Sequence, residues 1–448
     1  MTTRIAIVGS GISGLSAAHV LKKHPKIEVS LYEANDYYGG HTHTVNVQAQ
    51  THSGVQSYPV DTGFLVFNER TYPKLIALFK ELNIPTALSE MSFSVQASKN
   101  ESELIEWSGS SINSVFAQRK NLFNLDFLSM LKDILRFNSL TTSLALSEKN
   151  DALNTPLIEF LREHKFNSFF IHWYLLPMLG CIWSCPPDQM LAFPVSTMIR
   201  FCHNHGLLQV SNRPRWYTVA GGAKQYVDII TSSITHKYLN TPVLNIERAG
   251  ETVYVDSARG RDEFKHVIIA SHADQALKML RNPTDLEKNL LGAFKFKDNT
   301  AILHTDHKVL PCKKLAWAAW NFESNTSHTK DLNTQDSHSK ISTLPSVCLH
   351  YYLNKLQPLP FVEPVIVSLN PIREIDSSKI SAVFNYTHPI FDLGTNRAQE
   401  QMVNIQGKQN TWFAGAWMSY GFHEDGHKAG DAVANSLLKH LEQEGTLS

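Results

Sequence analysis

A glycine-rich turn near the start of the chain constrains the fold more than any other feature. The sequence "RIAIVGSGISGLSAAHVL" places Gly9, Gly11 and Gly14 directly after the apolar run Ile5–Val8. A short apolar run followed by G-x-G-x-x-G indicates a buried parallel strand that turns sharply into a helix. In that motif the first glycine allows the tight turn, the second lets backbone amides approach a pyrophosphate, and the third lets the helix pack on the strand.

The residues that follow complete a nucleotide-binding unit. "ISGLSAAHVLKKH" has helical spacing, and "KIEVSLYEA" predicts a second strand that ends at Glu33. An acid at this place accepts hydrogen bonds from ribose hydroxyls. The helix N-terminus would face the phosphates. The pattern therefore predicts a bound dinucleotide and leaves NAD and FAD both open.

Length and charge limit the remaining possibilities. The 448 residues suggest two or three domains, and 43% hydrophobic with 18% charged residues indicates a globular protein. Lys+Arg and Asp+Glu both number 41, so no overall field would attract nucleic acid. We expect no nucleic-acid partner.

No pattern of a secretory signal is present, and the five cysteines do not resemble a disulfide framework, so we expect a cytoplasmic protein. The apolar stretch at 169–183 is short for a bilayer span and contains His172 and Pro177. The helical spacing at 122–137 predicts a core-facing helix, with peripheral contact at the inner face of the membrane as the alternative.

A second glycine pair follows in "NDYYGGHTHTV", where Gly39 and Gly40 allow the backbone to crowd a phosphate; an ordinary turn is the alternative. Here the chain resembles the flavoprotein amine oxidase superfamily, which includes phytoene desaturases and protoporphyrinogen oxidases. In that superfamily an acid followed by a Gly-Gly loop touches FAD. His41 stands where many members have arginine, which removes a permanent charge near the pyrophosphate.

The resemblance continues to the end of the chain. "YTVAGGAKQYVDII" looks like the segment that re-enters the FAD domain, and Val243 stands where the adenine is usually flanked. "HVIIASHADQAL" and "TWFAGAWMSYGFHEDGHKAGDAVANSLL" look like the later strands and the closing helix, with Ala416 in place of an acid. Blocks such as "VDTGFLVFNERTYP", "LHTDHKVLP" and "AWAAWN" are similar to a bacterial subfamily of predicted NAD/FAD-binding proteins. The resemblance, together with the lack of a second G-x-G-x-x-G, implies FAD.

The resemblance also implies an α/β fold in which a Rossmann-like FAD-binding domain is interleaved with an α+β substrate domain. The expected FAD-binding segments are 1–70, 215–275 and 406–448, and the expected substrate-domain segments are 71–214 and 276–405. The aromatic-rich stretches at 169–183 and around "AWAAWNF" either wall a cavity over the flavin or form ordinary core. The polar stretch at 331–342 predicts a surface loop.

The block "GFHEDG" precedes the last helix, whose N-terminus would stabilise negative charge on the reduced flavin; Asp425 as its N-cap is a compatible reading. The expected cofactor-binding residues are Gly9, Gly11, Ile12, Ser13, Gly14, Glu33, Ala34, Gly39, Gly40, His41, Thr42, Val243, Gly415, Ala416, Phe422, His423, Glu424 and Gly426.

The sequence assigns no catalytic residue, and the candidates are His304, Asp306 and His423. His304 and Asp306 lie two apart and could relay a proton from one face of a strand, or could simply bond each other or nearby backbone. Many amine oxidases carry a lysine that has no counterpart around "FKFKDNTAIL". The residues Cys181, Cys185, Cys202, His203 and His205 match no zinc spacing, so we expect no metal.

These observations favour an FAD-dependent oxidoreductase that oxidises or desaturates an apolar substrate, with a lipid acyl chain as our hypothesis, and leave the electron acceptor open. The alternatives are an amine oxidase, an FAD-dependent isomerase or hydratase without net redox, a non-catalytic binding protein of the same fold, and a nicotinamide dehydrogenase.

Overall fold

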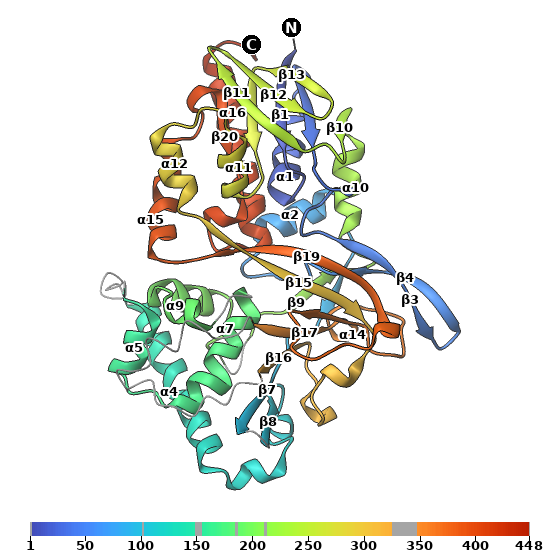
Figure 1. Cartoon of the computed structure of the whole chain (residues 1–448), viewed down its shortest axis with the longest axis vertical. Helices are drawn as coiled ribbons and strands as arrows, with labels where there is room; N and C mark the ends of the chain where they lie inside the picture. Colours follow the sequence, from blue (N-terminus) through green and yellow to red (C-terminus); the bar gives the residue numbers. More distant parts are fainter. Residues whose placement is uncertain are drawn as a thin grey trace.

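The computed structural model describes residues 2–100, 103–147, 155–183, 187–209, 213–324 and 347–447. Figure 1 shows two lobes, with both chain termini at the end of one of them. The N-terminal strand and the C-terminal helix lie in this upper lobe, and the long strands β15 and β19 cross from it into the lower one. The expected loop at 331–342 lies outside the described residues.

The upper lobe is built on a five-stranded parallel sheet in the order β10-β2-β1-β14-β20. Its strands are β1 (Thr3–Val8), β2 (Ile27–Tyr32), β10 (His236–Tyr238), β14 (His266–Ile269) and β20 (Thr411–Phe413). Successive side chains of β1 point to opposite faces. Ile5 and Ile7 pack in one core with the helices, whereas Ala6 and Val8 pack in another with the antiparallel sheet. Both faces are buried, as a parallel sheet requires.

Two helices cross closely on one face of this sheet. They are α1 (Ile12–Leu21) and α16 (His423–Gln443). A Cβ on Gly14 would stand 1.9 Å from the carbonyl oxygen of Gly9, and one on Gly430 would stand 2.0 Å from the carbonyl oxygen of Ser13. The glycine at 430 therefore lets α16 pack closely on α1, and the glycine at 14 lets α1 pack closely on the turn that precedes it.

The other face is covered by a three-stranded antiparallel sheet and two helices. They are β11 (Val243–Ala249), β12 (Thr252–Ser257), β13 (Gly260–Phe264), α11 (Ala273–Met279) and α12 (Asp285–Gly292). Helices α2 (Pro73–Glu81) and α10 (Lys224–Ser232) join the core on the α1 side. The α/β fold class is thus confirmed. The segment boundaries stay a prediction: α2 and α12 pack with the upper lobe although they fall in segments expected to be substrate domain.

The lower lobe contains a mixed seven-stranded sheet in the order β19-β15-β18-β17-β16-β7-β8, in which only the β16 and β7 pair is parallel among the described strands. Its strands are β7 (Phe93–Asn100), β8 (Glu103–Ser108), β15 (Lys295–His304), β16 (Trp320–Ser324), β17 (Cys348–Tyr352), β18 (Ile366–Leu369) and β19 (Ile380–Ile390). Smaller pairings are β3 (Thr44–Thr51) with β4 (Gly54–Asp61), and β9 (Trp216–Val219) with β5 (Phe67–Asn68) and β6 (Thr86–Ser89).

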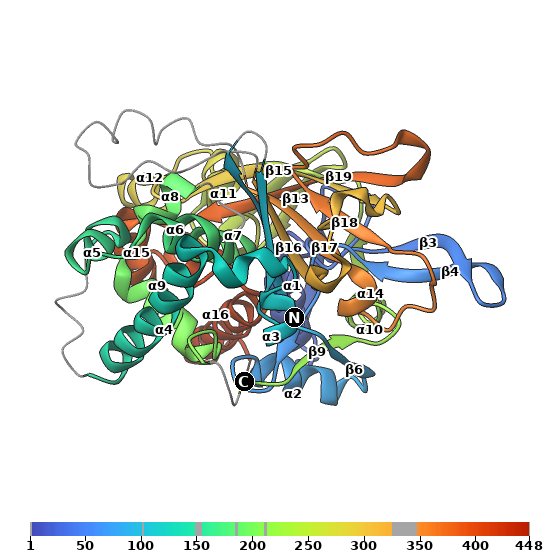
Figure 2. The same ribbon diagram turned by 90° about the horizontal axis from the view of Figure 1, so that it is seen from below.

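A group of helices packs beside this sheet (Figures 1 and 2). It comprises α3 (Ile112–Val115), α4 (Leu125–Leu146), α5 (Leu157–Glu163), α6 (Ser168–Phe170), α7 (Leu176–Trp183), α8 (Pro187–Leu191) and α9 (Val195–Asn204). Two helices outside this group are α14 (Leu353–Leu356) and α15 (Leu393–Gln401). The helix predicted at 122–137 begins at Leu125, because Asn124 caps it by accepting from the amides of Asp126 and Phe127. Phe127, Met130 and Phe137 form its core-facing side, as predicted.

The apolar stretch at 169–183 forms α6, a π turn (Ile171–Leu175) and α7. Trp173 and Leu179 are buried in the core, whereas Tyr174 and Met178 line a cavity. None of the described helices is long and apolar enough to cross a membrane.

Candidate active site

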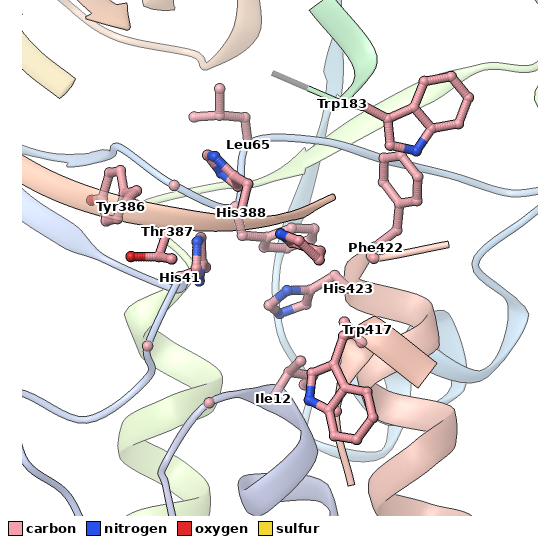
Figure 3. Close-up of a pocket in the computed structure, with 18 of the residues that line it drawn as sticks. Ile12, His41, Leu65, Trp183, Tyr386, Thr387, His388, Trp417, Phe422 and His423 are labelled. Atoms are coloured by element: carbon pink, nitrogen blue, oxygen red, sulfur yellow. The ribbon is translucent and has the colours of Figure 1, made fainter. Parts of the chain in front are cut away.

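A cavity of about 1400 Å³ runs between the two lobes. One end is lined by the glycine turn of the upper lobe, and the other by aromatic side chains of the lower lobe. Figure 3 shows the middle of it, where Ile12, His41, His388 and His423 lie around the same space.

The glycine turn forms a cradle in which backbone replaces side chains. Gly9 has φ +102°, and a Cβ there would stand 2.8 Å from the carbonyl oxygen of Ala270. A Cβ on Gly40 would stand 3.1 Å from Cα of Gly11. A Cβ on Gly11 itself would meet no protein atom within 4 Å, since this residue faces the cavity. The first turn of α1 follows at once, so its free amides meet a space that a pyrophosphate would fill.

Glu33 follows the end of β2 and lines the same end of the cavity. Its Oε2 accepts from the backbone amide of Ser10 at 2.9 Å and from the hydroxyl of Ser10 at 2.5 Å. Its Oε1 accepts from the amide of Asn35 at 2.9 Å. The carboxylate is therefore fixed at the edge of the cradle. Its contact with ribose stays a prediction.

Most of the expected cofactor residues line this cavity: Gly9, Gly11, Ile12, Ser13, Glu33, Ala34, Gly39, Gly40, His41, Val243, Gly415, Ala416, Phe422 and His423. Four others lie outside its lining. Gly14 and Gly426 are at helix contacts, where a Cβ on Gly426 would stand 2.6 Å from Cγ2 of Ile12. Thr42 bonds Tyr226 and His423 through its hydroxyl.

Glu424 makes its described contacts away from the cavity, and its expected contact with FAD stays a prediction. Its buried carboxylate accepts from the amides of Lys74 at 3.2 Å and Leu75 at 2.9 Å, in the first turn of α2, and pairs with Lys428. A carboxylate at a helix N-terminus is stabilised by the free amides there. Glu424 thus joins α16 to α2, and the described contacts give it no atom facing the cavity.

The start of α16 corrects one expectation. Asp425 is not the N-cap, because the helix begins at His423 and Phe422 holds the capping position. The carboxylate of Asp425 instead reaches back to accept from the amide of Phe422 at 3.0 Å, which is the role of an acid at the third helical position. Burial raises the pKa of Asp425 to about 6.

His423 is fixed where α16 meets the cavity. Its ring stacks on Phe64 with centroids 3.9 Å apart and planes 11° apart. Its Nε2 lies 2.8 Å from the hydroxyl of Tyr226 and 3.2 Å from that of Thr42. Burial lowers the pKa of His423 to about 3. The imidazole is therefore neutral and held in one orientation at physiological pH.

Three further histidines gather beside the cradle. The ring of His41 lies 5.3 Å from that of His388 and 6.4 Å from that of His272. Burial lowers the pKa of each, that of His388 to about 4. Nδ1 of His388 accepts from the Asn299 side-chain amide at 2.9 Å, so its Nε2 carries the proton. Nε2 of His41 is buried with no partner among the described residues, as expected of an atom that faces a bound group.

The far end of the cavity is a chamber of aromatic and aliphatic side chains. It is lined by Trp107, Tyr174, Met178, Ile182, Trp183, Phe201, Leu207, Trp216, Trp320, Tyr351, Phe391, Tyr420 and Phe422. The carboxylates among the described lining residues are Glu33, at the cradle, and Glu90, which pairs with Lys355 at 3.0 Å. The one lysine in that lining is Lys278 of α11, in the upper lobe. The sequence signals for this chamber were the stretch at 169–183 and the segment "AWAAWNF", which contributes Trp320.

His304 and Asp306 lie outside the described lining. The amide of Asp306 donates to Nδ1 of His304 at 3.0 Å, and Nε2 of His304 donates to the hydroxyl of Ser368 at 2.6 Å. That hydroxyl donates to Nδ1 of His350 at 2.7 Å, and Nε2 of His350 donates to Glu323 at 2.9 Å. The structure thus favours the bonding alternative for these two residues over a relay at the cavity.

The cysteine and histidine candidates for a metal form no three-ligand group among the described residues. Cys181 and His205 line the chamber, and Cys202 is buried behind it. Cys185 lies outside the described residues. The described groups close enough to share an ion are Glu323 with Cys348 and His350, and His266 with His440 and Glu444. In the first of these, Arg373 already pairs with Glu323 at 2.6 Å.

The family model described as flavin-containing amine oxidoreductase matches residues 12–438. The chain belongs to this family. It is an FAD-dependent oxidoreductase, which confirms the expected cofactor and enzyme class. The cradle fits the cofactor because the open space at Gly11, the fixed carboxylate of Glu33 and the unpartnered nitrogen of His41 all border one cavity.

Solved structures of the same fold have low sequence identity to the chain. Cyclohexylamine oxidase from Brevibacterium oxydans has a TM-score of 0.65 and 16% identity, covering 99% of this chain and 100% of that chain. A fatty acid isomerase from P. acnes has a TM-score of 0.63 and 13% identity, covering 97% and 98%. Putrescine oxidase bound to putrescine has a TM-score of 0.64 and 14% identity, covering 98% and 99%. No curated protein sequence matches the chain.

Proposed function

We propose that the protein oxidises or desaturates an apolar organic substrate, with a lipid acyl chain as the best candidate. The observation that carries this proposal is a single cavity that joins the FAD cradle to an aromatic chamber. An acyl chain that enters the chamber leaves water, which contributes about 0.8 kcal/mol for each buried methylene group.

The charges of the chamber argue against an amine. An alkylamine arrives as a cation near neutral pH, and burying an unpaired cation is costly. Glu90 is exposed and already paired with Lys355, and Glu33 belongs to the cradle. His205, within the chamber, has its pKa lowered to about 4 by burial. Arg213 also lines the cavity; it is exposed, and its Nε donates to the carbonyl of Gln209 at 2.8 Å. The chamber therefore offers an ammonium group no unpaired carboxylate among the described lining residues, and its apolar wall suits an apolar chain.

The cofactor supplies a two-electron acceptor for a hydride from a substrate carbon. Desaturation also releases one proton from the neighbouring carbon, and the two electrons then pass to dioxygen or another acceptor. The chain's own residues orient the substrate and exclude water: Trp183 and Phe422 stand at the chamber wall in Figure 3. The N-terminal amides of α16 would stabilise negative charge that develops nearby.

The residues proposed to hold FAD are those of the cradle, with Glu33 on the ribose and the first turn of α1 on the pyrophosphate. His423 is proposed to border the flavin as a neutral, fixed ring. The cytoplasmic location expected from the sequence stays a prediction.

The test is anaerobic mixing of the purified FAD-loaded protein with a panel of saturated and unsaturated acyl lipids and of primary and secondary amines. We expect loss of the oxidised flavin absorbance with at least one lipid, together with a product that has gained a double bond. Rapid reduction by amines alone would show that the protein is an amine oxidase. A lipid whose double bond moves while the flavin stays oxidised would show an isomerase, an activity for which the fold of the P. acnes enzyme is a precedent.

A pair of chamber variants separates charge from shape. Met178 lies on α7, is 8% exposed and lines the chamber. Met178→Glu should slow reduction by an acyl lipid on the order of tenfold or more, because it places a carboxylate against the chain. Met178→Leu keeps an apolar side chain of similar volume and should react nearly as the wild type does. Equal rates for both variants would contradict an apolar substrate at this position.

A further inference from the structure

Large apolar side chains stand exposed together at the end of the lower lobe. Ile112 is 82%, Phe123 88% and Leu125 80% exposed, and Leu122 and Leu315 are also exposed. We call these five residues the apolar tip. They come from α3, the 3-10 turn η1 (Arg119–Phe123), the start of α4 and the 3-10 turn η5 (Lys314–Ala316). Figure 2 looks onto the end of the molecule that carries α3 and α4.

Hydrogen bonds hold the segments of the tip together. The guanidinium of Arg119 donates to the carbonyl of Phe116 at 2.9 Å and to the side-chain oxygen of Asn113, which ties η1 to α3. Asn124 caps α4, while Phe127 beneath it is fully buried. Contacts join α3 to η5. The exposed side chains of the tip therefore extend from segments that hydrogen bonds hold in place.

The charged side chains around the tip are mostly basic. Arg119, Lys313 and Lys314 are exposed and have no carboxylate partner among the described residues, and Lys120 pairs with Glu103. Against these basic residues, the tip segments carry an acidic residue at Asp126. The whole chain has a formal net charge of zero, so this excess of cations is local. Apolar side chains ringed by basic ones fit a surface of anionic lipid.

The cavity reaches this same surface. Trp107 lines the chamber and is buried, while Gly109 and Ser110 line it and are exposed. Ile112 of the tip follows Ser110 by two residues. The substrate end of the cavity thus has an opening directly beside the apolar tip.

We propose that the apolar tip inserts into the headgroup region of an anionic lipid bilayer, so that the opening at Gly109 and Ser110 faces the membrane. The contact is peripheral, with Ile112, Phe123 and Leu125 as the inserted side chains and Arg119, Lys313 and Lys314 at the lipid phosphates. This surface supplies the route that an acyl substrate needs, and to that extent it deepens the proposed function. Binding to lipid requires only the apolar tip, and it does not require that the substrate be a lipid.

The test is sedimentation of the FAD-loaded protein with vesicles of phosphatidylcholine, with and without phosphatidylglycerol. We expect the wild type to sediment with the anionic vesicles and to be released by high salt. The double variant Phe123→Ser/Leu125→Ser should lose bound protein by about tenfold or more, because two apolar side chains no longer enter the lipid. The control is Val55→Ser/Val403→Ser, two exposed valines on β4 and near α15, which should sediment as the wild type does.

The bound flavin spectrum shows whether each variant has kept its fold. Failure of the wild type to bind anionic vesicles, or equal loss in both double variants, would overturn the proposal and favour a protein partner for the tip. Phe123→Trp adds a direct probe: its fluorescence should shift to shorter wavelength on vesicles, and that of Val403→Trp should not. If vesicles bind but no lipid reduces the flavin, the proposed substrate is wrong while the membrane surface stands.

Discussion

The two ends of the cavity are built in opposite ways. At the cradle, Gly9, Gly11 and Glu33 come from one short stretch of chain and act through backbone and one fixed carboxylate. At the chamber, Trp107, Trp320 and Phe422 come from distant parts of the chain and act through their side chains. The cradle therefore depends on positions where side chains are absent, and the chamber on positions where large ones are present. Substitutions should affect the two ends by different mechanisms.

The largest effect should come from glycines of the cradle. Gly14→Val places a side chain where even a Cβ stands 1.9 Å from the carbonyl of Gly9. Backbone cannot yield as a flexible side chain does, so we expect a loss of several kcal/mol and little folded protein. Gly11→Ala meets no protein atom within 4 Å. It should keep the fold and lower FAD affinity, because its methyl group enters the cofactor's space.

Thermal unfolding and FAD titration of the refolded apoprotein distinguish the two outcomes. If Gly11→Ala bound FAD as tightly as the wild type, the cofactor would not pass over Gly11, and the cradle would need another occupant.

A smaller effect is expected at Glu33. Glu33→Gln keeps the shape and one acceptor oxygen but removes the negative charge that accepts from Ser10 and from the proposed ribose. Hydrogen bonds to charged groups contribute roughly 1.5 to 3 kcal/mol, so FAD affinity should fall by about tenfold to a hundredfold. The measurement is FAD dissociation followed by flavin fluorescence. A variant that releases FAD no faster would show that the carboxylate serves only to hold Ser10.

The sequence predicts the cradle well because its geometry is local: a strand, three glycines and an acid fix backbone conformations over some thirty residues. It predicts the chamber only in part, since burial alone does not say whether Trp173 or Tyr174 faces the cavity. His388 enters the site through the pairing of β19 with β15, strands far apart in sequence, and no local pattern indicates that. The aromatic segment around Trp320 was noticed, but its sequence left a cavity wall and ordinary core both open. Asp425 was misplaced by three positions along the helix because the capping residue, Phe422, has no side-chain acceptor to reveal it.

Lowering the pH should lower the stability of the folded protein, because the buried histidines of the site are neutral. The pKa of His423 is about 3 in the fold and near its ordinary value of 6.5 once unfolded. Between those values the unfolded chain binds a proton that the folded chain does not, so stability falls as the pH falls from about 6.5 toward 3. The loss is about 1.4 kcal/mol per pH unit for one such group. Asp61 and Asp425, whose pKa values are raised to about 6, act in the opposite direction.

The variant His423→Gln isolates the contribution of His423 to this pH dependence, because Asp61 and Asp425 remain in both proteins. Urea unfolding at pH 7 and pH 5, at constant FAD, should show a smaller pH dependence in the variant. Glutamine keeps a polar group near Tyr226 and Thr42. An unchanged pH dependence would mean that folding does not shift the pKa of His423.

The smallest effect is expected at Gly426, where the cradle and α16 meet. A Cβ there would stand 2.6 Å from Cγ2 of Ile12 and 3.1 Å from the hydroxyl of Ser13, both of which are side-chain rather than backbone atoms. Alanine also stabilises a helix by roughly 1 kcal/mol relative to glycine. Gly426→Ala should therefore change overall stability by less than about 1 kcal/mol, while a shifted Ile12 alters the flavin absorbance, because Ile12 lines the cavity. Gly430→Ala is the control: its Cβ would stand 2.0 Å from a backbone oxygen, so it should destabilise the protein strongly. A Gly426→Ala protein with an unaltered flavin spectrum would show that the first turn of α1 touches the cofactor only through backbone.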